Sequence, residues 1–115
     1  MNDKKIFIGC HDKTNQQFVE IIINDLGAMI TEDPHESNLM IVDLLRITSG
    51  LENMNLKYLK PETPAIILSG QINDINEKIL EYLKERGVIE KKVIIRIPIV
   101  MEIFKSELKK LLTSN

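Results

Sequence analysis

Tryptophan is absent from this sequence, cysteine occurs once, and only 4% of the residues are aromatic. The lone cysteine excludes an internal disulfide and fits a reducing compartment. So few aromatic side chains give no stacking platform for nucleic-acid bases. A basic excess is missing too, because 15 lysines and arginines stand against 17 acidic residues. This charge balance argues against nucleic-acid binding.

Long apolar runs are also missing. No stretch reaches the roughly 20 residues that a membrane-spanning helix needs, and residues 1–5 lead into the first predicted strand without a signal-peptide pattern. We therefore expect a cytoplasmic protein that does not enter a membrane. The 115 residues are 43% apolar and 28% charged, so residues 1–115 are predicted to form a single globular domain.

Short apolar runs alternate with segments of helical periodicity along the chain. The predicted strands are 5–9, 28–31, 39–44, 65–68 and 93–97. The first predicted helix runs from a cap at Thr14 or Asn15 to Leu26, and the others span 50–59, 74–86 and 99–112. Gly27 and Gly87 are expected to end two of these helices. Leu80 and Ile103 are among the positions expected to face the core. This alternation predicts a mostly parallel sheet with helices on both faces.

The connection between the second and third strands is unusually short. Only residues 32–38, which include Pro34, separate them. A crossover with its helix takes a dozen or more residues. The second helix is therefore expected to be short or missing.

Asp43 ends the apolar run 39–43. In an open parallel sheet, ligands and chemistry gather at the carboxyl ends of the strands, so Asp43 lies where a functional carboxylate is expected. The first strand ends at the same edge, and there the chain reads Cys10, His11 and Asp12 rather than a cluster of acids. A purely structural alternative is that Asp43 caps the following turn or pairs with a nearby cation.

The order and spacing of these segments resemble a response-regulator receiver domain over nearly the whole chain. The resemblance rests on the first strand 5–9, the run 39–45 with Gly50 seven positions after Asp43, the fourth strand ending in Ser69 and Gly70, and the fifth strand ending in Pro98. It implies a flavodoxin-like (CheY-like) sheet of five parallel strands in the order 2-1-3-4-5. It also implies that Asp43 stands at the phospho-acceptor position and Ser69 at the switch position.

The chain departs from the receiver pattern at the positions that would hold a metal and a phosphoryl group. Cys10 and His11 align with the acidic pair that binds Mg²⁺ in receivers, only Asp12 follows as an acid, and Ile97 aligns with the family lysine. Mg²⁺ prefers hard oxygen ligands, for which cysteine and neutral histidine are poor substitutes. Cys10, His11 and Asp43 are ligand types that suit zinc, but adjacent residues at a strand end point in opposite directions. The resemblance is therefore to a degenerate receiver, or pseudo-receiver, and no metal or cofactor is predicted.

The predicted function is a non-catalytic signalling module of two-component type that acts by contact with a histidine kinase or an effector domain, with a homodimer as a further option. In the family, the fourth helix, the fifth strand and the fifth helix form the partner surface. By resemblance, this surface includes Tyr82, Arg86, Arg96, Ile99 and Val100.

Two other functions remain open. One is a working phospho-receiver that uses Mg²⁺ and the acceptor Asp43, with Asp12 or Arg46 compensating for the missing groups. The other is a phosphocysteine carrier that uses Cys10, because a cysteine just before a helix N-terminus is placed as thiolate nucleophiles are.

Overall fold

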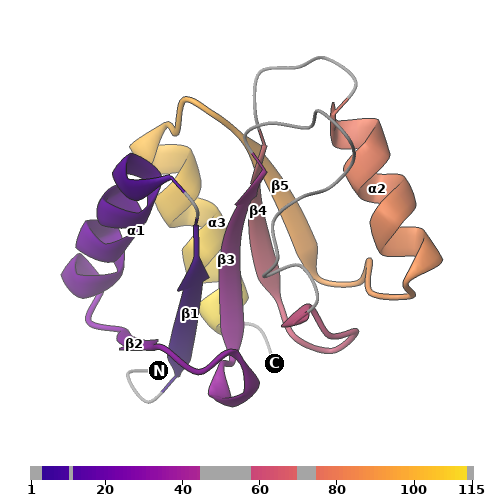
Figure 1. Ribbon diagram of the computed structural model, residues 1–115. Helices are drawn as coiled ribbons and strands as arrows, with labels where there is room; N and C mark the ends of the chain where they lie inside the picture. The colour runs from indigo at the N-terminus through magenta and orange to yellow at the C-terminus, as the bar shows by residue number, and fades with distance from the viewer. Residues whose placement is uncertain (1–3, 11, 45–57, 70–74, 114–115) are drawn as a thin grey trace.

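A computed structural model describes residues 4–10, 12–44, 58–69 and 75–113, with the main chain alone at 44, 75, 76, 78 and 79. Figure 1 shows the described residues as coloured ribbon. The strands are β1 (Lys5–Gly9), β2 (Met29–Thr31), β3 (Leu39–Leu44), β4 (Ala65–Ser69) and β5 (Lys92–Arg96). The helices are α1 (Lys13–Asp25), α2 (Ile75–Glu85) and α3 (Met101–Thr113), with one turn of 3₁₀ helix, η1 (Pro34–Glu36).

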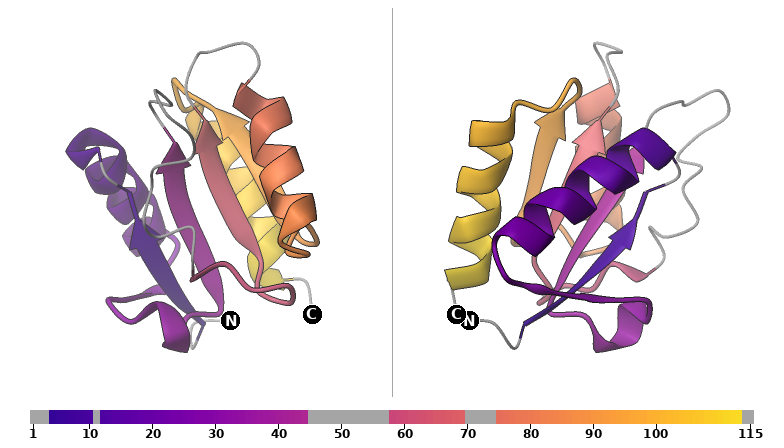
Figure 2. Two further views of the ribbon diagram at one scale, coloured as in Figure 1. Left: turned by 45° about the vertical axis from the view of Figure 1, so that its right-hand side comes forward. Right: turned by 90° about the vertical axis from the view of Figure 1, so that its left-hand side faces the viewer.

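The five strands form one parallel sheet in the order β2-β1-β3-β4-β5. This confirms the predicted fold class and strand order. The register places Asp43 beside Leu68, and Ser69 beside Leu44. The carboxyl ends of β1, β3 and β4 therefore lie side by side at the same end of the sheet (Figure 2).

Each face of the sheet carries its own hydrophobic core. α1 and α3 cover one face, where Leu39 and Ile41 of β3 pack, and α2 covers part of the other, where Met40 and Val42 pack (Figure 1). Strand residues alternate between these cores because successive side chains point to opposite sides of a strand. Burial on both faces explains why β3 and β4 are almost continuously apolar.

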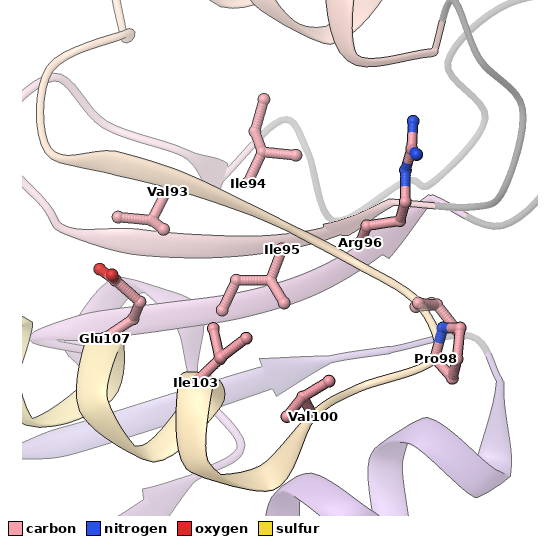
Figure 3. A pocket seen from close by; sticks show the side chains of 9 residues that line it. Val93, Ile94, Ile95, Arg96, Pro98, Val100, Ile103 and Glu107 are labelled. Carbon is pink, nitrogen blue, oxygen red and sulfur yellow. The ribbon is translucent and has the colours of Figure 1, made fainter.

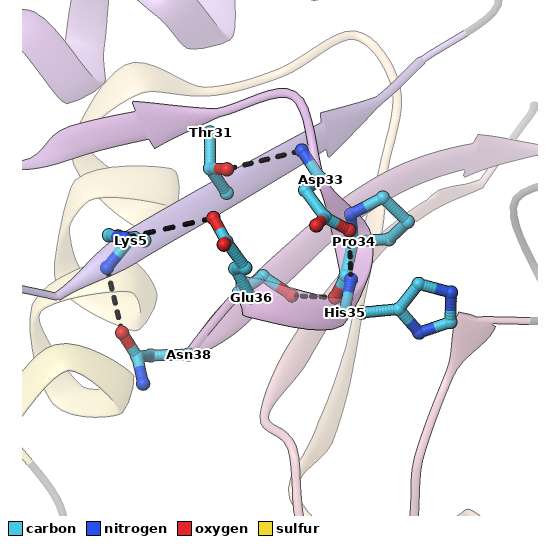
Figure 4. A network of polar contacts seen from close by, with 8 residues as sticks. Lys5, Thr31, Asp33, Pro34, His35, Glu36 and Asn38 are labelled. Atoms are coloured by element: carbon cyan, nitrogen blue, oxygen red, sulfur yellow. Dashed lines mark hydrogen bonds and ion pairs between the residues drawn. The ribbon is translucent and has the colours of Figure 1, made fainter.

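The connection between β2 and β3 is held by local hydrogen bonds around η1 (Figure 4). The Asp33 Oδ1 atom accepts from the His35 main-chain N–H at 2.9 Å, which caps the turn. The Lys5 N–H donates to the Asn38 Oδ1 atom at 2.9 Å, and the Lys5 ammonium lies 3.7 Å from Glu36 Oε2. The prediction of a short second helix is confirmed.

Lys92 ties the segment before β4 to the start of β5. Its ammonium donates to the main-chain oxygens of Lys60, Thr63 and Glu90 at 2.8, 2.7 and 2.9 Å. An ammonium has three donors and no acceptor, so these three carbonyls match its full donor capacity. The side chain thus joins β4 and β5 at their N-terminal ends, opposite the strand ends where Asp43 lies.

Several local predictions need correction. Asp12 caps α1, not Thr14 or Asn15, and the strand predicted to reach Ile97 ends at Arg96. Leu80 and Ile103 are exposed rather than buried. Ile103 lies beside Phe104, which faces the core with Leu108 and Leu112, so only part of the apolar surface of α3 is covered.

Two predicted helix ends are confirmed, and one predicted helix falls mostly on residues that the structure does not describe. Gly27 and Gly87 follow their helices with φ of +75° and +68°, a conformation that glycine adopts without strain. Most of the predicted helix 50–59 lies outside the described residues. In the described part of the chain, no helix is long and apolar enough to cross a membrane.

Candidate functional site

The candidate site lies where β1, β3 and β4 end, next to the N-terminus of α1. Asp43 is 2% exposed, although it is an acid. Its Oδ2 atom accepts from the main-chain N–H of Asp12 at 3.1 Å and from Asn15 Nδ2 at 3.5 Å. The N-terminus of α1 adds a favourable field for a negative charge. Asp43 is therefore a buried carboxylate held by donors from the first turn of a helix.

Asp12 uses its side chain to cap α1. Its Oδ2 atom accepts from the Asn15 main-chain N–H at 3.4 Å, and its backbone is extended, with φ −81° and ψ 123°. An N-cap acid satisfies one of the free N–H groups of the first helical turn. Asp12 thus contributes its main chain to Asp43 and its side chain to the helix.

Asn15 is the site residue that sequence reasoning assigned wrongly, as a cap rather than a ligand of Asp43. It is buried together with Val19, Ile22 and Ile23 on one face of α1. A polar residue at a core-facing helical position needs a hydrogen-bond partner. The signal in the sequence was the spacing of Asn15 from Val19, Ile22 and Ile23, which places it on the buried face of the helix. A buried asparagine there predicts a polar partner for its side chain at the end of the sheet.

Cys10 is buried in the core on the α1 side of the sheet. Burial raises the pKa of its thiol, and the negative charges of Asp43 and Asp12 raise it further. A thiol acts as a nucleophile only as its thiolate. The surroundings of Cys10 therefore oppose its use as a phosphocysteine nucleophile.

Ser69 closes β4 and is fully buried. Its carbonyl oxygen accepts from the Ile97 N–H at 2.9 Å. Its Oγ atom has no hydrogen-bond partner among the described residues, so it is not bonded to Asp43. A buried hydroxyl without a partner carries a desolvation cost.

Of the remaining positions of the degenerate site, the structure describes only Ile97. Ile97 is half-buried and packs against the core on the α1 and α3 side. His11 and Arg46 lie outside the described residues. Among the residues that are described, no group of three or more histidine, cysteine or acidic side chains could hold a metal ion.

The residues of the predicted partner surface lie on or next to α2, on β5, and in the connection from β5 to α3. Arg86, which directly follows α2, donates to the hydroxyl of Tyr82 on α2 at 2.8 Å and lies over the Tyr82 ring, 5.5 Å from its centroid. Arg96 and Val100 are exposed, and Ile99 is half-buried against the core. A groove of about 500 Å³ between β5 and α3 includes Arg96 and Val100 (Figure 3).

Comparison with known proteins identifies the fold through solved structures alone. No protein-family model and no curated protein matches the chain. The receiver domain of a sensor histidine kinase from Pseudomonas aeruginosa, solved with a magnesium ion in its active site cleft, aligns with a TM-score of 0.67 at 14% identity, over 97% of this chain and 99% of that one. A response regulator from Thermotoga maritima aligns with a TM-score of 0.64 at 14% identity, over 97% and 99%.

A third structure, the non-phosphorylated HemR receiver domain from Leptospira biflexa, aligns with a TM-score of 0.64 at 13% identity, over 98% of this chain and 97% of that one. Alignments that cover both chains almost completely show the same arrangement of elements. At these identities, the likeness concerns the fold. The chain therefore has the flavodoxin-like fold found in response-regulator receiver domains.

Proposed function

We propose that the protein is a non-enzymatic signalling module of receiver type that acts by protein contact in the cytoplasm, without Mg²⁺-dependent phosphorylation of Asp43. The hydrogen bonding of Asp43 supports this most directly. The same carboxylate oxygen accepts from Asp12 and Asn15, as a structural anchor between β3 and α1 would. The partner is a histidine kinase or an effector domain that contacts the surface formed by α2, β5 and α3.

The residues at the positions that bind metal and phosphate in receivers also support the proposal. Phosphoryl transfer depends on positioning and on cations that neutralise charge. The Asp12 carboxylate is engaged as a helix cap, Cys10 is a soft ligand in a buried setting, and Ile97 supplies no charge. These described residues do not fit a magnesium site, which calls for hard oxygen ligands.

The test is to add beryllofluoride with Mg²⁺ and to record amide shifts of Asp12, Asp43 and Ser69 by NMR, with intact mass measured after acetyl phosphate treatment. We expect no saturable shift at these amides and no phosphoryl adduct. A receiver with a complete acidic pocket serves as the positive control. A response that is present in the wild type and lost in Asp43→Asn would show that Asp43 is a working acceptor, and it would overturn the proposal.

The second candidate is a phospho-receiver with acceptor Asp43, and one observation favours it. The Ser69 Oγ atom is buried without a partner among the described residues, as a switch hydroxyl waiting for a phosphoryl oxygen would be. The beryllofluoride experiment separates the two candidates, because only the second predicts a Ser69 shift that depends on Asp43.

A further inference from the structure

β5 is the last strand of the sheet, so one of its edges lacks a neighbouring strand in the described part of the chain. The N–H of Ala65 donates to Lys91 O at 3.1 Å, and the N–H of Ile97 donates to Ser69 O at 2.9 Å. The N–H and C=O of one strand residue point to the same side, and the side alternates along the strand. The main-chain groups of Lys92, Ile94 and Arg96 therefore point away from β4, to the open edge.

A hydrophobic groove lies beside this edge. Val93 and Ile95 project from β5 toward α3, and Val100 and Ile103 line the other side (Figure 3). Ile97, which follows β5, also lines the groove. Val100 and Ile103 are 53% and 54% exposed. An apolar groove next to outward-pointing main-chain donors and acceptors has the two features by which an extended peptide is bound, because the main chain gives affinity and alternate side-chain pockets give specificity.

The charges at the edge indicate what kind of strand it accepts. Arg96 is exposed and lies at one end of the groove, and its guanidinium points away from α3 (Figure 3). Side chains directly opposite each other on adjacent strands interact, and opposite charges stabilise such a pair. An added strand with a carboxylate opposite Arg96 would gain this pair while its alternate residues fill the groove.

The same charges disfavour a second copy of this chain at the edge. An antiparallel two-fold pairing of β5 with itself, centred on Ile94, would place Arg96 opposite Lys92 of the other copy on the same face. Like charges that lie directly opposite each other destabilise a strand pair. In this register, the edge therefore fits a partner of different sequence better than it fits a second copy of itself.

We propose that the outer edge of β5 binds an extended segment of a partner protein as a sixth strand. Branched apolar side chains at alternate positions of this segment enter the groove between β5 and α3, and an acidic side chain between them pairs with Arg96. This inference rests on the proposed function of protein contact, and it names how that contact is made.

The test uses a fluorescent octapeptide of alternating valine and threonine with one central threonine replaced by glutamate. We expect saturable binding by fluorescence anisotropy and, by NMR, downfield shifts and slowed exchange of the Ile94 and Arg96 amides. Arg96→Glu should weaken binding about ten-fold or more, and a lysine in place of the peptide glutamate should restore it. The same peptide with N-methylated amides on its edge-facing side should not bind.

Ile103→Glu should abolish binding, and Ile21→Glu is its matched control. Ile21 is also an exposed helical isoleucine, at 65%, and lies on α1 away from the groove. Equal effects of these two variants, equal binding of the N-methylated peptide, or no binding of any peptide would each overturn the inference. So would a concentration-dependent dimer, seen by sedimentation, that Ile103→Glu dissociates.

The outcomes separate this inference from the proposed function. An Asp43-dependent beryllofluoride response would overturn the proposed function. It is recorded without peptide and is identified by its loss in Asp43→Asn, whereas peptide binding is identified by its loss in Arg96→Glu and Ile103→Glu; both sets of variants are needed because Ser69 and Arg96 are neighbours in the sheet. A peptide that fails to bind overturns only strand addition at β5, since the beryllofluoride measurement uses no peptide and depends on Asp43.

Discussion

Replacing Ser69 with alanine should stabilise the protein. The Ser69 hydroxyl is fully buried and has no hydrogen-bond partner among the described residues, and such burial costs about 1–3 kcal/mol in protein mutational data. The alanine variant leaves a space of roughly one oxygen atom, about 15 Å³, which offsets about 0.4 kcal/mol at 24 cal/mol per Å³. The expected gain in the free energy of unfolding is therefore about 1–2 kcal/mol.

The gain should be visible as a change in the melting temperature. At about 2.1 cal/mol/K per residue, the unfolding entropy of a 115-residue chain is about 0.24 kcal/mol/K. A gain of about 1.5 kcal/mol then raises Tm by about 6 °C. Calorimetry gives Tm, and urea unfolding at pH 7 gives the free energy at 25 °C.

Ser37→Ala is the matched control for this experiment. The Ser37 hydroxyl donates to the Pro34 carbonyl oxygen at 2.7 Å, so its removal should lower the free energy of unfolding by about 1 kcal/mol. Opposite signs for the two serines are the expected result. A loss of stability in Ser69→Ala that matches the control would refute the reasoning, because it would show that Ser69 already has a partner.

Three further predictions concern the Cys10 thiol, the Asp12 helix cap and the half-buried Lys92 ammonium. Cys10 should react with iodoacetamide slowly in the native protein and rapidly in urea, because burial raises the pKa of its thiol; equal rates would contradict this. The unfolded thiol ionises above about pH 8.5 while the folded one keeps its proton, so stability should fall by up to about 1.4 kcal/mol per pH unit above that value, and Cys10→Ala should remove this slope in urea unfolding. Asp12→Ala should cost about 1 kcal/mol in urea unfolding and Asp12→Asn much less, since asparagine also caps helices; equal losses would count against the cap. Lys92→Met should cost about 1–2 kcal/mol, because three carbonyls lose their donor, whereas Lys91→Met at the exposed neighbour should change the free energy by less than about 0.5 kcal/mol.

The fold was largely predictable because the sequence repeats one simple pattern. Buried parallel strands such as β3 and β4 are apolar on both faces, and the glycines after α1 and α2 mark helix ends. The strand order came from a resemblance to a known family, since apolar patterning does not specify which strands are neighbours. The exposed Ile103 was mispredicted because helical periodicity does not show where the sheet ends.

The site was predictable in its position but not in its hydrogen bonding. Asp43 was located correctly at the end of β3, and Asp12 beside it. Three polar residues near the start of α1 could each have capped the helix, and the choice of Asp12 depends on a tertiary contact with Asp43. That contact joins residues 31 positions apart, so no local rule contains it.

The short connection between β2 and β3 also bears on how the chain folds during synthesis. Closing a short loop costs less conformational entropy than closing a long one, and contacts that are local in sequence form faster. β2 and β3 both pair with β1, so these three strands and α1 can associate once residue 44 has left the ribosome. β4 can then pair with β3, and β5 with β4, in the order in which these strands are synthesised.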